Sequence, residues 1–185
     1  MIKIEVDDLI KKLENKNVMI VFAPKYNISG IGVELANKLS KRGVVFYFSC
    51  IKTCKHLLGT FSQIGAKIEN IKIIDGITRT ITSTPPKSEG CVYLSAPYKF
   101  EEMFIAIKEL SREKTLDFFV FDALSTVAIY YGYAVSREIG ITVKFVNLLQ
   151  LINDKCKIIF LSSDDSKDDP LIQEVLTLVD EVVES

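Results

Sequence analysis

Short apolar segments alternate along the chain with longer segments in which apolar residues recur at helical spacing. Runs rich in branched and aromatic residues have the length and composition of buried strands, at 18–23, 44–48, 71–74, 91–96, 117–121 and 157–161. Apolar positions at 3.6-residue spacing predict helices at 7–15, 31–43, 53–64, 100–110, 138–152 and 171–179. A last strand is expected at 181–183, and a polar stretch at 77–90 is expected to be a loop or a hairpin excursion.

Strands that alternate with helices from one end of the chain to the other predict a mostly parallel sheet. We therefore expect an α/β fold of three layers, with helices on both faces of a central sheet. The length of 185 residues suits one domain, 1–185, and no repeat or linker divides it. Ligands bind beyond the carboxyl ends of the strands in such sheets, which directs attention to the loops at 24–32, 49–52, 122–132 and 162–169.

The charges of the chain are balanced, with 23 basic and 24 acidic residues and a net charge of −1. This balance gives no strong nucleic-acid signal and no general attraction to an anionic membrane. The longest apolar stretch, 118–135, contains Asp122, which a membrane-spanning helix tolerates poorly, so we interpret it as a strand followed by a loop. The N-terminal residues carry no signal-peptide core, and we expect a cytoplasmic protein.

Four cysteines, Cys50, Cys54, Cys91 and Cys156, and a single histidine, His56, form no paired metal-binding motif. Zinc sites need about four such ligands at short paired spacings, so a metal site of this kind is not expected. Three of the cysteines lie in or beside apolar runs, where cysteine behaves as a small buried hydrophobe. We expect all four to be reduced thiols.

The loop at 24–32 follows the first strand and precedes a helix, which is the position of a phosphate-binding loop. Such a loop reads G-x-x-x-x-G-K-[ST], because its backbone N–H groups, lysine and hydroxyl hold the phosphates and Mg²⁺. No register of this loop places a lysine before a hydroxyl. Ser29, Gly30 and Gly32 could still present backbone N–H groups to an anion, with Lys25 reaching it from the start of the loop. The glycines could equally serve only a tight turn.

The Gly-Ile-Gly run at 30–32 also resembles a dinucleotide-binding turn, G-x-G-x-x-G. Leu35 replaces its third glycine, and Ser49 stands where the second strand should end in an acidic residue. Tyr133 and Arg137 have the spacing of the Tyr-x-x-x-Lys pair of short-chain dehydrogenases, but arginine does not supply the chemistry of that lysine. An NAD(P)-binding protein of this type is therefore kept as an alternative.

The strand at 117–121 is followed by Asp122. Apolar residues followed by an aspartate have the form of a Walker B strand, whose carboxylate orients Mg²⁺ and water near the phosphates. An aspartate at the end of a strand is by itself also a common cap. We expect this strand to lie directly beside the strand at 18–23.

When the residues around Asp122 in the sequence are included, the chain resembles the RecA/KaiC-like ATPases, particularly the prokaryotic KaiC-like proteins of unknown role. The run Asp122-Ala123-Leu124-Ser125-Thr126 is similar to their Asp-Ser-Leu-Ser-Thr run, and 91–110, 157–163 and 178–183 look like the elements around it. The resemblance implies a RecA-like P-loop fold, self-association or a protein partner, ATP or ADP with Mg²⁺ as ligand, and Asp122 at the metal. The nucleotide-binding residues would be Lys25, Ser29, Gly30, Gly32, Asp122 and Ser125.

Two catalytic elements of that family are missing. The Lys-[Ser/Thr] pair is absent, and Ser49-Cys50-Ile51-Lys52 stands where active members carry the acidic residue that polarises water. Losing both should abolish useful turnover. We therefore expect a degenerate, non-hydrolysing domain that binds nucleotide or acts as a regulatory or protein-interaction module. The alternative is an active nucleotide-dependent enzyme that uses Lys25 in a displaced P-loop.

Two further clusters have simple explanations. The acidic loop at 164–169 could bind a divalent cation, but a solvated loop whose Asp169 caps the helix opened by Pro170 explains it better. The tyrosines at 130, 131 and 133 could stack on a base or fill a partner's pocket. A partly buried loop at the edge of the sheet is the simpler interpretation.

Overall fold

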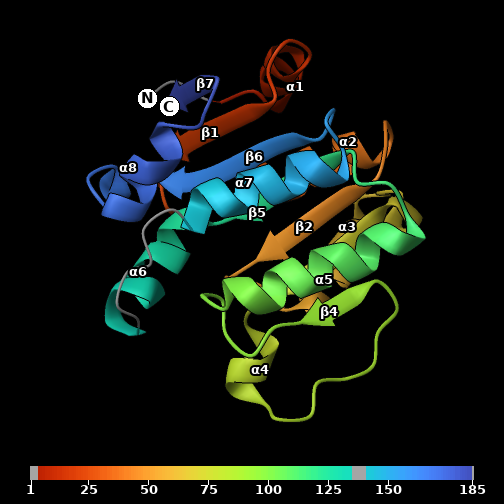
Figure 1. The fold of residues 1–185 in the computed structure, drawn as a ribbon. Helices are drawn as coiled ribbons and strands as arrows, with labels where there is room; N and C mark the ends of the chain where they lie inside the picture. Colours follow the sequence, from red (N-terminus) through yellow and green to blue (C-terminus); the bar gives the residue numbers. More distant parts are fainter. Residues whose placement is uncertain (1–3, 135–140, 185) are drawn as a thin grey trace.

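The computed structural model describes the backbone of residues 4–134 and 141–184. Within these ranges, seven strands form one sheet in which all neighbouring strands run parallel. The strands are β1 (Val18–Ala23), β2 (Val45–Ser49), β3 (Ile71–Asp75), β4 (Cys91–Tyr93), β5 (Phe118–Asp122), β6 (Lys157–Ser163) and β7 (Glu181–Glu184). Across the sheet they follow the order β4-β3-β2-β5-β6-β1-β7 (Figure 1).

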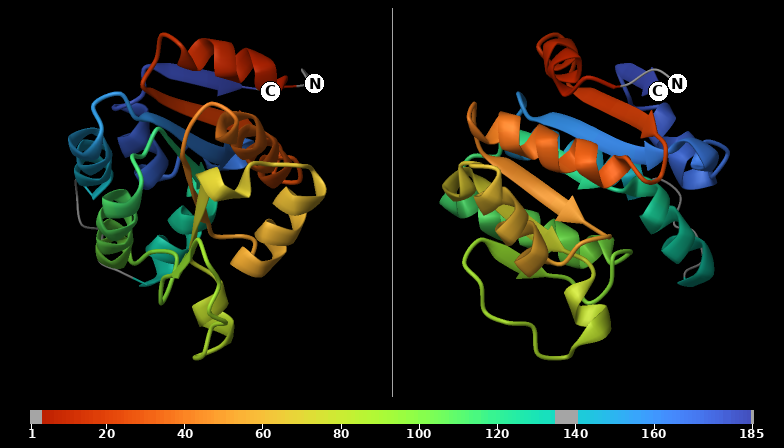
Figure 2. Two further views of the ribbon diagram at one scale, coloured as in Figure 1. Left: turned by 90° about the vertical axis from the view of Figure 1, so that its right-hand side faces the viewer. Right: turned by 180° about the vertical axis from the view of Figure 1, so that it is seen from behind.

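Helices cover both faces of this sheet, which confirms the expected three-layer α/β fold. One face carries α1 (Val6–Leu13), α2 (Ile28–Ser40) and α3 (Cys54–Gln63) (Figure 2). The other carries α5 (Phe100–Glu113), α7 (Ile141–Ile152), α8 (Pro170–Leu176) and the first turns of α6 (Leu124–Ala134). A short helix, α4 (Thr78–Ile81), lies in the long segment between β3 and β4, away from both layers (Figure 1).

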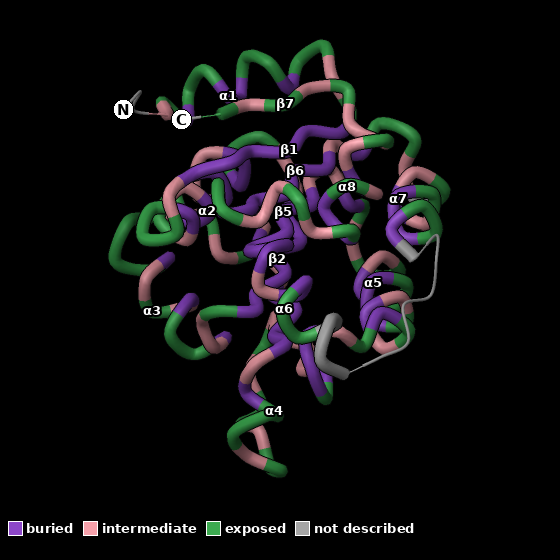
Figure 3. The backbone as a smooth tube through the Cα atoms, turned by 90° about the vertical axis from the view of Figure 1, so that its left-hand side faces the viewer, coloured by how far each residue is buried: buried purple, intermediate pink, exposed green. Residues whose placement is uncertain are grey.

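The central strands are apolar on both faces because a helix layer covers each. In β1, all six residues are buried, and they alternate between the two cores of the molecule. Figure 3 shows the same burial along the middle of the sheet, with exposed residues on the outer sides of the helices. The core on the α5 side is rich in aromatic rings: Phe145 lies 5.1 Å from Phe119 and 5.7 Å from Phe121, centroid to centroid. Each such pair adds about 0.5–1.5 kcal/mol beyond the burial of its area.

Strands β1 and β5 are not neighbours, contrary to the expectation from sequence. β6 lies between them and pairs with both, Val18 with Ile158 and Phe119 with Ile158 in register. A continuous apolar run shows only that both faces of a strand are covered, and it does not identify the strands beside it. Because all strands are parallel, their carboxyl ends still meet at one edge of the sheet.

The segment after β5 is a helix, α6, rather than the expected loop. Its residues are apolar on nearly all sides, so they give no amphipathic periodicity by which a helix is recognised. Its first turns are buried against β6 and α8, whereas Ile129 and Tyr130 are exposed. The side chains of the tyrosines at 131 and 133 lie outside the described residues.

The other elements begin and end within three residues of their predicted bounds, although 138–140 of the predicted helix at 138–152 lie outside the described residues. The polar stretch at 77–90 contains α4 and otherwise irregular backbone.

None of the helices in the described part of the chain has both the length and the apolar character needed to cross a membrane.

Candidate functional site

A pocket of about 900 Å³ opens at the carboxyl edge of the sheet. Segments that follow five different strands contribute to it, which is where ligands bind in parallel α/β sheets. The residues that line it are Lys25, Ile28, Cys50, Ile51, Ile77, Ser125, Thr126, Ala128, Ile129, Tyr130, Ser163, Asp165, Ser166 and Asp169.

The connection between β1 and α2 is much shorter than the loop expected at 24–32. The helix begins at Ile28, so only residues 24–27 connect it to the strand, and the Asn27 N–H donates to the Pro24 carbonyl at 2.8 Å to close the turn. Ser29, Gly30 and Gly32 are therefore residues of the helix. Sequence reasoning missed this because Asn27 and the glycines carry turn signals, whereas the register of the helix is set by packing.

The backbone of this turn does not form the cradle of a phosphate-binding loop. Such nests alternate right- and left-handed residues so that successive N–H groups converge on an anion. Across 24–32, no residue has a positive φ angle. Ile28, the first residue of α2, is buried where the helix begins.

The two glycines of α2 have different surroundings. A Cβ atom at Gly30 would meet nothing within 4 Å. At Gly32, a Cβ atom would lie 2.7 Å from the Tyr47 hydroxyl and 2.8 Å from Leu161 Cδ1, closer than atoms can approach without a shift. Gly32 therefore allows α2 to pack closely over the sheet.

The Asp122 carboxyl is buried beneath this contact. It shares the α2 face of the sheet with the Tyr47 hydroxyl, which donates a hydrogen bond to Asp122 Oδ2. Asp122 Oδ1 and Ser29 Oγ are both buried without a hydrogen-bond partner. Ser29 Oγ lies near enough to the carboxyl to influence its pKa, but it does not meet the geometry of a hydrogen bond.

Burial dominates the ionisation of this cluster. It raises the pKa of Asp122 above its usual value, while the hydroxyls of Tyr47 and Ser29 and the charge of Lys52 act in the opposite direction. Burial, followed by the charge of Asp122, raises the pKa of Tyr47 well above its usual value. Burial thus disfavours the charged form of both side chains in this pair.

These residues do not fit Mg²⁺ and a triphosphate held in the manner of a P-loop. Mg²⁺ prefers six oxygen ligands and usually keeps several waters, which requires an open carboxylate. Asp122 is fully buried and is not among the residues that line the pocket. Over the described ranges, no group of three or more His, Cys, Asp or Glu side chains is placed to hold a metal ion.

The six residues expected to bind nucleotide are thus divided. Lys25 and Ser125 line the pocket, and Ser125 Oγ accepts a hydrogen bond from the Ser163 N–H at 3.2 Å. Ser29, Gly32 and Asp122 belong to the buried contact beneath α2, and Gly30 lies on the exposed side of that helix.

The pocket has apolar walls and two carboxyl groups. Ile28, Ile51 and Ile77 contribute apolar surface, and Asp165 and Asp169 are acidic. Sequence reasoning placed Ile51 in the loop at 49–52 and Ile77 at the start of the polar stretch at 77–90, but it expected neither to line the site. Their only sequence signal is their position just after a strand end.

The acidic loop at 164–169 is arranged by local hydrogen bonds. Asp169 Oδ1 accepts from the Leu171 N–H at 2.8 Å, and Pro170 is the first residue of α8, which confirms the predicted cap. Asp165 Oδ1 accepts from the Ser163 hydroxyl. These hydrogen bonds explain the positions of the Asp165 and Asp169 side chains, and no bound cation is needed to explain them.

A tight turn follows β2 where the resemblance places an acidic residue. Ser49 Oγ accepts from the Lys52 N–H at 3.0 Å and donates to the Lys52 carbonyl at 2.8 Å. Cys50 is buried, and burial raises the pKa of its thiol well above the usual value. A protonated thiol of this kind cannot act as a general base toward water.

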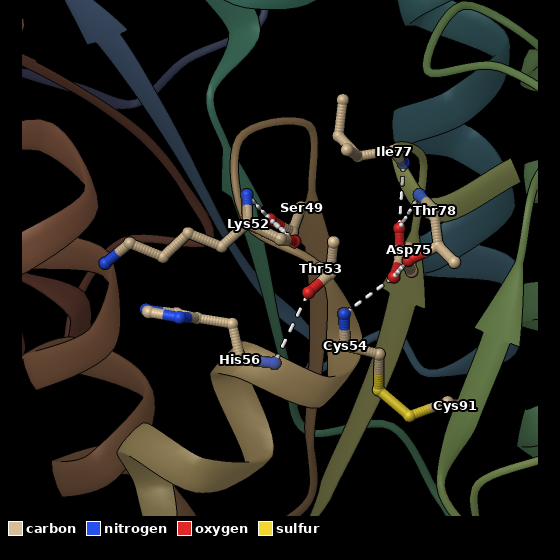
Figure 4. The surroundings of a disulfide bond; sticks show 9 residues. All are labelled: Ser49, Lys52, Thr53, Cys54, His56, Asp75, Ile77, Thr78 and Cys91. Atoms are coloured by element: carbon tan, nitrogen blue, oxygen red, sulfur yellow. Dashed lines mark hydrogen bonds between the residues drawn. A yellow bond between two sulfur atoms is a disulfide. The ribbon is translucent and has the colours of Figure 1, made fainter. Parts of the chain in front are cut away.

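The expectation of four reduced thiols is wrong for two of them. Cys54 and Cys91 form a disulfide between the start of α3 and the start of β4 (Figure 4), with Cα atoms 6.3 Å apart. Cys50 and Cys156 are free and buried. This pair could not be predicted from the sequence because its members lie 37 residues apart and become neighbours only when β4 joins the sheet.

The geometry does not support the dinucleotide-binding alternative. In the doubly wound dinucleotide fold the first strand lies beside the second, whereas β1 here lies between β6 and β7. Gly30 and Gly32 lie within α2 instead of forming a turn before it. Arg137 and the side chain of Tyr133 lie outside the described residues.

Comparison with protein-family models and with curated proteins found no match. Two solved structures share the fold. The KaiC-like protein PH0186 from the hyperthermophilic archaeon Pyrococcus horikoshii OT3 is 11% identical, with a TM-score of 0.59 over 91% of this chain and 70% of that one. The flagellar accessory protein FlaH from Methanocaldococcus jannaschii is 17% identical, with a TM-score of 0.59 over 99% of this chain and 78% of that one. With the all-parallel sheet, these similarities show that the chain has the RecA/KaiC-like fold.

Proposed function

We propose that this chain is a non-hydrolysing RecA/KaiC-like domain that acts as a binding module through the pocket at the carboxyl edge of its sheet. The observation that carries the proposal is the burial of Asp122. Its carboxyl bonds to Tyr47 beneath α2 instead of facing the pocket. A carboxylate in this position cannot orient a metal ion and water beside a triphosphate.

Phosphoryl transfer depends on charge neutralisation and on a positioned water. The loop after β1 offers no lysine at the start of its helix, and Cys50 stands where a general base would be needed. A general base contributes about 10²–10⁴-fold to a rate, and a charge-stabilising donor about 10²–10³-fold. The combined loss favours binding without turnover.

The character of the pocket favours a protein partner over a nucleotide. Its volume lies in the range of ligand sites, but its charged lining residues are Asp165, Asp169 and Lys25, and this net negative charge would repel a triphosphate. Ile51, Ile129 and Tyr130 are between 43% and 53% exposed around it, and a cluster of exposed apolar residues typically marks an interaction surface. The partner surface that fits is apolar with basic residues, whether on another protein or on a second copy of this chain.

Phosphate release and calorimetric titration with ATP and Mg²⁺ test the first part. We expect no turnover above the buffer background. Sustained phosphate release by the purified chain that disappears in Asp122→Asn would overturn the proposal, because a contaminating ATPase would survive that substitution.

Self-association tests the second part. Sedimentation velocity over a hundredfold concentration range should show reversible assembly if the partner is a second copy, and Ile129→Asp should abolish it. Lys108→Asp, on the exposed side of α5, is the matched control. Assembly that persists in Ile129→Asp would show that another surface is responsible.

Lys25 supports a second candidate, nucleotide binding by a displaced lysine, because its side chain lines the pocket. In this case Lys25→Ala should weaken ATP binding at least tenfold in calorimetry, while Lys41→Ala, at the far end of α2, should leave it unchanged. Equal affinities for ATP in both variants would exclude this candidate.

A further inference from the structure

The Cys54–Cys91 disulfide joins a short edge strand of the sheet to the body of the domain. β4 has three residues, all half-buried, and pairs on one side only, with β3. Cys91 begins this strand, and Cys54 begins α3, which packs on the sheet beside it. The disulfide therefore holds β4 in place where few backbone hydrogen bonds do so.

The same disulfide adjoins a cluster of hydrogen bonds around the buried Asp75 carboxyl. The Cys54 N–H donates to Asp75 Oδ2 at 2.6 Å, at the end of β3. Asp75 Oδ1 accepts from the N–H groups of Ile77 and Thr78, both at 2.8 Å, and the Thr78 hydroxyl donates to Oδ2 (Figure 4). Asp75 thus connects the first residue of α3 to the start of α4.

The hydrogen bonds of Asp75 also position one wall of the pocket. Ile77, whose N–H is bound by Asp75, is one of the lining residues. The disulfide is therefore connected to Ile77 by two hydrogen bonds, one from the Cys54 N–H to the Asp75 carboxyl and one from the Ile77 N–H to the same carboxyl. Figure 4 shows that the side chains of Lys52 and His56 point away from the disulfide, so they do not shield it.

We propose that Cys54 and Cys91 form a reversible thiol–disulfide site that fixes or releases the β4 edge and, with it, the segment 76–90 that carries Ile77. The site itself is independent of the proposed function. Its influence on binding rests on the pocket being the binding surface.

The burial of the two cysteine residues sets the direction of the reaction with a dithiol reductant. Cys54 is fully buried, whereas Cys91 is half-buried on the edge strand, so a thiolate of the reductant attacks the Cys91 sulfur. The disulfide breaks, Cys54 leaves as a thiolate and takes a proton. The second thiol of the reductant then attacks the mixed disulfide and releases Cys91. Two electrons and two protons reach the protein, and the reductant becomes a cyclic disulfide.

The other two cysteines do not interfere. Burial raises the pKa of Cys50 well above its usual value and that of Cys156 to about 12, so both thiols stay protonated and poorly reactive. The exchange is therefore confined to a single pair.

Thiol titration of the full chain after denaturation tests whether the site exists. Protein equilibrated with oxidised glutathione should show two reactive thiols, and protein reduced with dithiothreitol should show four. Cys91→Ser should give three in both conditions. Four thiols in the wild-type protein after the oxidising treatment would overturn the proposal.

Hydrogen exchange of the oxidised and reduced wild-type protein tests the consequence. Reduction should speed exchange at least tenfold for the amides of Ile73 and Leu94, which bond across the β3–β4 pair, and leave β1 and β6 unchanged. Reoxidation should restore the slow exchange. Cys50→Ala with Cys156→Ala is the control and should respond as the wild type does. Identical exchange at the β4 edge in both redox states would overturn the proposal.

Discussion

Two buried aspartates end strands of the same sheet, and their surroundings are opposite. Asp75, at the end of β3, accepts hydrogen bonds from three backbone N–H groups and one hydroxyl. Asp122, at the end of β5, accepts one from Tyr47, and its other oxygen has no partner. The first carboxyl is built into the fold. The second is buried with incomplete hydrogen bonding.

This contrast is most strongly tested by Asp75→Asn, from which we expect the largest loss of stability. The amide replaces an acceptor with a donor that faces N–H groups, so hydrogen bonds to a charged group are lost and donors are left unsatisfied. Urea denaturation should show a decrease of about 3 kcal/mol or more in the free energy of unfolding. Asp154→Asn, on the exposed surface, is the control and should change it by less than about 0.5 kcal/mol. A decrease no larger than that of the control would refute the structural role of Asp75.

Gly32→Ala tests the close approach that seals Asp122. The added methyl group would overlap Tyr47 and Leu161, and overpacking of this kind costs about 1–3 kcal/mol. Gly30→Ala is a matched control on the same helix and should stabilise by up to about 1 kcal/mol, since nothing lies near its Cβ. Thermal unfolding measures both, and equal shifts would mean that α2 does not lie this close to the sheet.

Tyr47→Phe removes the one hydrogen bond of the Asp122 carboxyl. We expect a loss of about 1–2 kcal/mol at neutral pH, because both carboxyl oxygens would then be buried without a partner. In the background of Asp122→Asn the loss should be smaller, since a neutral amide needs the donor less than a carboxylate does. Additive effects in this double-mutant cycle would show that the two side chains do not interact.

Asp122→Asn should give the smallest change, and in the opposite direction. Because burial raises the pKa of Asp122, the folded protein binds its proton more tightly than the unfolded chain. Below the pKa of an unfolded aspartate, the carboxyl is protonated in both states and destabilises the folded protein least. As pH rises through the folded pKa, the buried carboxyl ionises and the free energy of unfolding falls. The asparagine variant keeps an acceptor for Tyr47 and should gain about 1 kcal/mol at neutral pH.

The measurement is the difference in unfolding free energy between the two proteins from pH 4 to pH 8. It should grow with pH and then level off. A variant that loses stability at every pH would mean that the Asp122 carboxylate is a net stabiliser, as Asp75 is.

The sequence predicted the architecture because buried parallel strands and amphipathic helices leave strong periodic signals. Val18–Ala23 could be assigned from six consecutive apolar residues, and the Asp169 cap from the proline that follows it. Helix α6 was missed because an almost wholly apolar helix has no polar face to reveal its period.

The site was predicted less well because its features depend on distance in space. Whether Asp122 faces a ligand or Tyr47 depends on how closely α2 approaches the sheet. Gly32 permits a close approach, but a glycine in the sequence does not show that the approach occurs. The pairing of Cys54 with Cys91 depends on which strand joins the edge of the sheet. Lys25 and Ser125 do line the pocket, because strand ends in a parallel sheet converge at one edge, and their role in binding stays a prediction.

The short connection between β1 and α2 has a consequence for any attempt to design an ATP-binding site on this scaffold. Residues 24–27 close a single tight turn before the helix begins. Exchanging side chains, for example a lysine and a threonine at positions 28 and 29, would place them on helical backbone with no room for a phosphate group to be enclosed. Several residues would have to be inserted and α2 displaced from Tyr47, so a phosphate-binding loop at this position would need a change in chain length, which point substitutions do not supply.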